Sequence, residues 1–153
     1  MTIAFLAFLL GILSGLRAFM SLVAVAWATR LHRLHVETTR LAFLGYAATP
    51  FVSTALAVIE FITDQLPSTA SRKVAKQFIP RLLLSLLAGT ALGVASGSLF
   101  VCIISSLFGA VAGTYGGASA RRAMARMFGN DRPAALLEDC VAIVLAIDIV
   151  VSI

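Results

Sequence analysis

The sequence predicts an all-α polytopic membrane protein, with about five transmembrane helices in a single domain over residues 1–153. Hydrophobic residues make up 60% of the chain, and charged residues only 12%. A soluble domain carries about 25% charged residues, roughly twice this fraction. The apolar residues are also gathered into runs of about 20, the length that a helix needs to cross the hydrocarbon of a bilayer.

Five runs are expected to be transmembrane helices: residues 3–29, 41–63, 82–97, 98–119 and 134–153. The third is short and ends in the glycine-rich sequence GVASG. The first does not match a cleaved signal peptide, because no Lys or Arg precedes Arg17 and its apolar run exceeds the usual length of about 7–15 residues. The polar connections are too short to form a second domain.

The basic residues lie mainly between the predicted helices and indicate an orientation. The connections after the second and fourth helices hold eight of them, against three after the first. These are Arg72, Lys73, Lys76, Arg81, Arg121, Arg122, Arg126 and Arg132, against Arg30, Arg33 and Arg40. Cytoplasmic loops are enriched in Lys and Arg, so we expect a multi-pass protein of the bacterial inner membrane with a cytoplasmic N-terminus and an external C-terminus. The same distribution explains the net charge of +5 without nucleic acid as a partner.

Two segments of the chain resemble each other. FLLGILSGLRAF at 8–19 and SLFGAVAGTYGG at 106–117 both carry glycines four residues apart: Gly11 and Gly15, then Gly109 and Gly113. The next helices each have one acid in an apolar run, LAVIEF at 56–61 and VLAIDI at 144–149. A single intervening span would make this an inverted repeat of helices 1–2 and 4–5, as in many secondary transporters. The alternative is that the small residues only let two helices pack closely.

Six charged residues lie inside or at the ends of the apolar runs: Arg17, Glu60, Asp64, Glu138, Asp139 and Asp148. A charge in the middle of the membrane costs roughly 2.5–3.5 kcal/mol on insertion scales, so such residues normally pair or face a wet cavity. We expect Glu60, Asp64, Glu138 and Asp139 to gather with Arg81 near the cytoplasmic face. Arg17 is expected to lie deeper, about halfway along the first helix, and to pair with Glu60, or failing that with Glu138. The alternatives are a purely structural salt bridge for Arg17 and Glu60, a solvated helix end for Asp64, and stabilisation of a helix N-terminus for Asp139.

Catalytic and metal-binding patterns are absent from the sequence. His32 and His35 stand three apart with no third ligand nearby, whereas zinc requires three or four. Cys102 and Cys140 fall inside apolar runs without a CxxC spacing, and are expected to act as packing residues. We therefore expect no metal, no cofactor and no enzymatic activity.

The chain resembles the bacterial membrane family catalogued as domain of unknown function 4126. The resemblance rests on GLRAFMSL, EFITDQLP, IPRL and GTYGGASARR…AALLEDCVAI, which together span nearly the whole chain. It implies the membrane architecture but no function. It also implies a set of site positions: Arg17, Glu60, Asp64, Pro67, Arg81, Glu138 and Asp139. Similar proteins usually have lysine where this chain has Gln65, which puts in doubt any activity that needs the lysine.

The function expected from these features is a small transporter or channel for an ion or small polar solute, with Arg17 and the carboxylates lining the route. A homodimer is expected, because one chain has few helices with which to enclose a pathway and because the first and fourth predicted helices would expose small-residue faces. One alternative is a non-catalytic membrane scaffold or assembly protein, which a dry and fully paired set of charges would favour. Another is an intramembrane enzyme acting on a lipid head group, which a bound divalent ion would favour.

Overall fold

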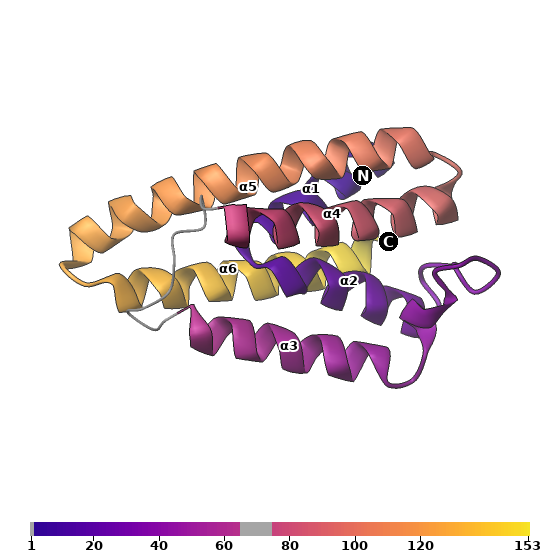
Figure 1. The fold of residues 1–153 in the computed structure, drawn as a ribbon, viewed down its shortest axis with the longest axis horizontal. Coiled ribbons are helices and arrows are strands. Elements are labelled where there is room, and N and C mark those ends of the chain that lie inside the picture. The colour runs from indigo at the N-terminus through magenta and orange to yellow at the C-terminus, as the bar shows by residue number, and fades with distance from the viewer. Residues whose placement is uncertain (1, 65–74) are drawn as a thin grey trace.

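The computed structural model describes residues 2–64 and 75–153, and in these ranges the fold is all-helical, as predicted (Figure 1). Six α-helices and one 3-10 turn follow in order: α1 Ile3–Leu16, α2 Ala18–Arg30, η1 Ala42–Gly45, α3 Thr49–Thr63, α4 Ala75–Ser96, α5 Leu99–Phe128 and α6 Asp131–Ser152. The long helices lie side by side as a bundle, with α5 along one edge and α3 along the other.

The first predicted helix is wrong, because residues 3–29 form two helices rather than one. Arg17 has an extended backbone (φ −140°, ψ 113°) and separates α1 from α2. After this break the chain turns back, so that α2 ends at the same end of the bundle where α1 begins (Figure 1). Arg17, at this break, is completely buried.

The other predicted helices exist, with different ends. The second, 41–63, divides into η1 and α3, and Pro50 stands in the first turn of α3, where its missing N–H costs nothing. The third begins earlier than predicted and contains Pro80. The fourth continues nine residues past the predicted end at 119, to Phe128, before Gly129 ends it with a left-handed backbone (φ 66°). The fifth begins at Asp131 rather than at 134.

The returning hairpin also changes the predicted topology. Both chain ends lie at the same end of the bundle (Figure 1). A chain that spans the bilayer in this arrangement has both termini on one side. The arrangement of the described helices therefore does not support the predicted cytoplasmic N-terminus together with an external C-terminus.

The four glycines of the resembling segments lie where α1 packs against α5. A Cβ atom added at Gly15 would come within 2.5 Å of the Ala110 carbonyl oxygen, and one at Gly11, Gly109 or Gly113 would meet the facing backbone as closely. Glycine alone allows this approach. These small-residue faces are thus covered within the chain, which removes the reason for predicting a homodimer from them.

The direction of α1 and α5 excludes the predicted inverted repeat. Gly109 faces the backbone of Phe8, and Gly15 faces that of Thr114, so residue numbers rise together along the contact. The two helices therefore run parallel. A two-fold axis in the membrane plane would make them antiparallel, so close packing is the explanation that the structure supports.

Two of the described helices, rather than five, are long and apolar enough to cross a membrane: α4, over Gln77–Ser96, and α5. Helices α1, α2 and α3 are apolar but shorter, and α6 contains four acidic residues. The outer surface is nevertheless rich in large apolar side chains, among them Phe100, Phe108 and Val144, which are 79%, 69% and 66% exposed. Such a surface suits contact with lipid rather than with water.

Candidate functional site

The break at Arg17 leaves the last carbonyl groups of α1 without helical partners, as at any helix end. Arg81 of α4 supplies the partner. Its Nη1 donates hydrogen bonds to the carbonyl oxygens of Gly15 and Leu16, at 2.8 and 2.7 Å. The Ser14 hydroxyl in turn donates to the Arg81 carbonyl oxygen at 2.7 Å. A cation thus lies at the partly negative C-terminal end of α1, where the helix dipole favours it.

The first N–H groups of α2 are capped by a carboxylate from another helix. The amides of Ala18 and Phe19 donate to the two carboxylate oxygens of Glu60, at 2.8 and 3.0 Å. Glu60 comes from the last turn of α3, and its carboxylate lies at the partly positive N-terminal end of α2. Both interrupted helix ends are therefore satisfied by ionised side chains of opposite sign.

The Arg17 side chain pairs with two acids from two other helices. Its Nη1 contacts Asp64 Oδ2 at the end of α3, and its Nη2 contacts Asp139 Oδ1 on α6. Its guanidinium also lies over the Phe61 ring, 5.3 Å from the centroid. The predicted pairing of Arg17 with Glu60 is wrong, because the backbone of α2 occupies the Glu60 carboxylate.

Glu138, the second predicted partner of Arg17, pairs instead with a residue that the sequence analysis did not place in the site. Arg121 Nη1 lies 3.7 Å from Glu138 Oε2. The same guanidinium donates to both oxygens of Asp131, at 3.0 and 2.5 Å. Arg121 was assigned to a loop because the apolar run ends at 119. The helical spacing of its neighbours in SARRAMARMF was the signal that α5 continues.

Seven side chains form one charge cluster at the end of the bundle where α1 ends and α2 begins. Six of them were predicted from the sequence, and Arg121 is the seventh. Arg81 Nη2 links the α1–α2 break to the acids of α3, at 3.6 Å from Glu60 Oε1 and 3.9 Å from Asp64 Oδ2. No side chain in the cluster is more than 14% exposed. The members are Arg17, Glu60, Asp64, Arg81, Arg121, Glu138 and Asp139.

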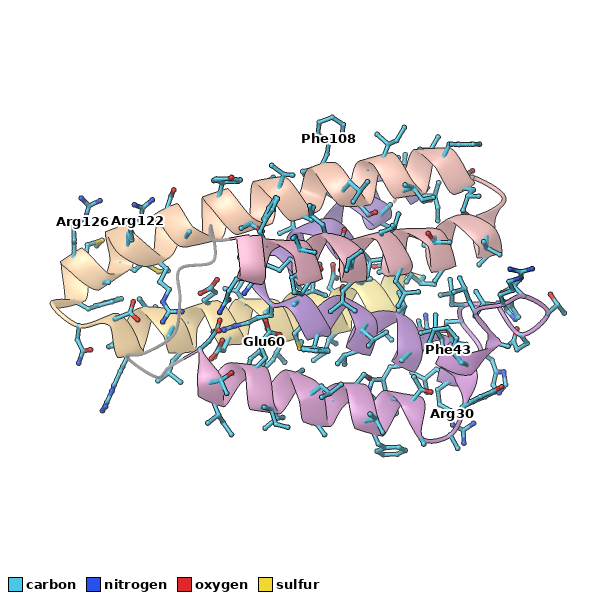
Figure 2. All side chains as sticks on the ribbon, viewed as in Figure 1. Arg30, Phe43, Glu60, Phe108, Arg122 and Arg126 are labelled. Atoms are coloured by element: carbon cyan, nitrogen blue, oxygen red, sulfur yellow. The ribbon has the colours of Figure 1, made fainter. Side chains whose placement is uncertain are left out.

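Figure 2 shows Glu60 facing the interior at the cluster end, while Arg122 and Arg126 project outward from α5 at the same end. Arg30 lies at the opposite end of the bundle. Asp148 lies outside the cluster, exposed on α6. His32 stands in an exposed loop, 3.9 Å from Glu37.

The cluster has a definite chemical capacity. Its three arginines keep their charge, whereas its four carboxylates can accept a proton or a cation. Protonation of Asp64 or Asp139 would therefore release one side of Arg17. Among residues 2–64 and 75–153, no group of three or more His, Cys, Asp or Glu is arranged to hold a metal ion. Gln65, Pro67, Arg72 and Lys73 lie outside the described residues, as does the side chain of Lys76.

Comparison of the chain with protein-family models, curated proteins and solved structures finds no match. The resemblance to domain of unknown function 4126 therefore stays a prediction, and the functional argument rests on the charge cluster itself.

Proposed function

We propose that this chain is a multi-pass protein of the bacterial inner membrane that carries a small ion or small polar solute, with the charge cluster as its gate. The observation that supports this most is Arg17, completely buried at the break between two half-helices and held by acids of two other helices. Interrupted helices mark the binding sites of many secondary transporters. Ionisable residues within a membrane domain are expensive and commonly functional.

In this proposal the structure represents the closed state. Arg17 joins the hairpin tip to α3 and α6 through Asp64 and Asp139. Arg81 of α4 contacts the last carbonyl oxygens of α1 and lies beside Glu60 and Asp64. The cluster therefore opens only when a carboxylate changes partner. A proton or cation arriving at Asp64 or Asp139 would weaken the hold on Arg17. The transported species then passes, and Arg17, which cannot lose its proton, attracts the carboxylate again and closes the cluster.

The orientation follows from the charges at the two ends of the bundle. Arg122 and Arg126 lie at the cluster end and Arg30 at the other end (Figure 2). Arg121, near the end of α5, and Arg132, in the first turn of α6, belong to the cluster end, and Arg33 and Arg40 follow α2 at the other end. With the buried Arg81, the first group is the larger, so we place the cluster end in the cytoplasm. Both termini are then external.

A non-catalytic scaffold is the second candidate, and the dryness of the cluster favours it. Arg17 is 0% exposed and Arg81 is 1% exposed, and both are paired. If the cluster never opens, its role is to fasten the hairpin tip to its neighbours.

Water access to the hairpin tip distinguishes the two candidates. We would place Leu16→Cys in a background of Cys102→Ser and Cys140→Ser, and treat the folded protein in vesicles with a charged, membrane-impermeant thiol reagent. Leu16 is buried beside the break, at 8% exposure. Transport predicts slow labelling that Asp64→Asn accelerates, because a weaker hold on Arg17 opens the cluster more often.

Two control positions calibrate this experiment. Arg126→Cys, exposed at the cluster end, should react rapidly, and Leu13→Cys, in the apolar core of α1, should not react. If Leu16→Cys stays as unreactive as Leu13→Cys from both sides, with and without Asp64→Asn, the scaffold is the correct function. If labelling instead supports transport, the carried ion is identified by measuring the flux of protons or alkali cations into vesicles, which Arg17→Gln should abolish.

A further inference from the structure

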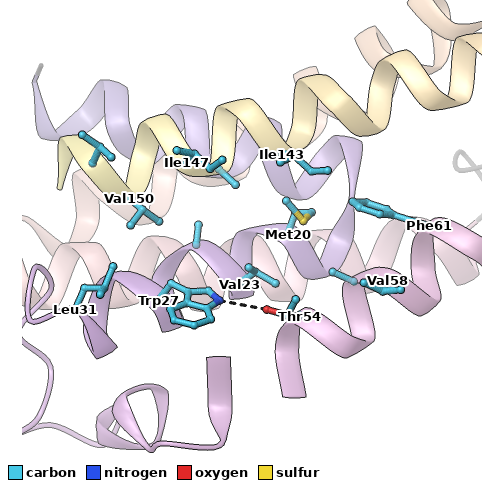
Figure 3. Close-up of a pocket in the computed structure, with 14 residues that line it drawn as sticks. Met20, Val23, Trp27, Leu31, Thr54, Val58, Phe61, Ile143, Ile147 and Val150 are labelled. Carbon is cyan, nitrogen blue, oxygen red and sulfur yellow. Dashed lines mark hydrogen bonds between the residues drawn. The ribbon is translucent and has the colours of Figure 1, made fainter. Parts of the chain in front are cut away.

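A groove of about 490 Å³ runs along the bundle between α3 and α6, with α2 as its floor (Figure 3). Both outer helices pack on α2 but hardly on each other, which leaves the groove open at the side. Met20 and Phe61 lie at its inner end, toward the charge cluster, and Leu31 and Val151 lie toward the other. Its volume is within the range of small-molecule sites, roughly 300–1,000 Å³.

The lining of the groove selects an apolar occupant. Its walls include Val58, Ile143 and Ile147, whose side chains are about half exposed. Polar side-chain atoms come from Trp27 and Thr54, and these are bonded to each other, Nε1 to Oγ1 at 3.2 Å (Figure 3). The groove thus offers an extended hydrocarbon a place to lie, and it opens onto the apolar outer surface of α3 and α6.

Two exposed arginines stand toward the outer end of the groove. Arg33 is exposed, and its Nη1 donates to the carbonyl oxygen of Val151, which lines the groove, at 2.7 Å. Arg30, which ends α2, is also exposed. The acids toward this end are Glu37, in the loop after α2, and Asp148, one turn before Val151 on α6. At the inner end, by contrast, the arginines are held by carboxylates.

We propose that the groove binds a phospholipid, with one acyl chain lying along α2 toward Phe61 and the phosphate at Arg33 and Arg30. The apolar walls match the chain, and the arginines at the outer end match the phosphate. From Met20 to Leu31 the floor is about 16 Å long, enough for most of an acyl chain. This inference rests on the proposed membrane location, but not on transport.

The chain has one tryptophan, Trp27, which lines the groove and reports on its occupant. We would reconstitute the full chain into phosphatidylcholine vesicles that contain a small fraction of phosphatidylglycerol brominated on its acyl chains. Bromine quenches indole fluorescence on contact. We expect stronger quenching than with the same fraction of brominated phosphatidylcholine, because phosphatidylglycerol carries a net negative charge.

Arg33→Gln should lower the preference for phosphatidylglycerol about fivefold, the typical effect of one basic residue near an anionic lipid surface. Arg126→Gln is the matched control, because Arg126 is exposed at the opposite end of the bundle. The preference measured at Trp27 should not change in that variant.

A second reporter separates the groove from the membrane location. Trp27→Phe with Phe108→Trp moves the indole to the outer face of α5 (Figure 2), where both brominated lipids should quench it equally. If neither lipid quenches this reporter, the membrane location fails, and the proposed function fails with it. Two other results overturn the groove proposal alone. In the first, this reporter is quenched but Trp27 is not. In the second, Trp27 is quenched but shows no preference for phosphatidylglycerol, or a preference that Arg33→Gln does not lower; a second protein segment is then the better occupant.

Discussion

Removing the Arg17 guanidinium tests the pairing on which the charge cluster depends. Arg17→Ala leaves Asp64 and Asp139 buried without the cation that contacts both of them. Loss of one partner from a buried ion pair typically costs about 3–5 kcal/mol. Because every 1.4 kcal/mol is a factor of ten, the ratio of folded to unfolded protein should fall by a factor of about 100 to several thousand.

The same reasoning predicts which second substitution restores stability. Arg17→Ala combined with Asp64→Asn and Asp139→Asn removes the two buried charges that have lost the Arg17 cation, so it should recover a large part of the loss. Arg17→Ala combined with Glu60→Gln should recover none, because Glu60 accepts hydrogen bonds from the α2 backbone. Reversible unfolding in mixed detergent micelles, followed by circular dichroism, measures these free energies.

Arg126→Ala serves as the matched control, since an exposed arginine away from specific contacts should change stability by no more than about 0.5 kcal/mol. Two results would refute the reasoning. One is that Arg17→Ala is as stable as this control. The other is that Glu60→Gln restores stability to Arg17→Ala while Asp64→Asn with Asp139→Asn does not.

Three further predictions use other parts of the fold. Gly113→Ala should destabilise the protein by about 1–3 kcal/mol through overpacking against Ile12. Gly116 lies on the same helix, but a Cβ added there meets nothing within 4 Å, so Gly116→Ala should stabilise by about 0.5–1 kcal/mol. Equal effects of the two substitutions in thermal unfolding would contradict the α1–α5 contact. Reporter fusions to the N-terminus and to the C-terminus should give the same result, and opposite results would exclude the returning hairpin. Arg121→Ala should free the start of α6 and speed amide hydrogen exchange near Glu138, and unchanged exchange there would show that the Arg121 pairs contribute little.

The sequence predicted those features that depend on local composition and spacing. The apolar content predicted helices, and glycines four residues apart predicted a close helix contact, which α1 and α5 make. Six of the seven cluster residues were also found from the sequence, because a charge inside an apolar run is costly and needs a partner. None of these inferences depends on the direction in which the chain runs.

Only the tertiary structure decided how the chain returns and which charges meet. No Pro or Gly stands at position 17, and the residues around it are as apolar as a continuous span, so nothing local shows that the helix breaks there. The break is stable because Arg81 and Glu60, more than 40 residues away in sequence, satisfy the exposed ends of α1 and α2. Because the Glu60 carboxylate is bound by the α2 backbone, Arg17 pairs with Asp64 and Asp139 instead. The choice of partner therefore follows from three-dimensional competition for each carboxylate, which the spacing of residues along the chain does not encode.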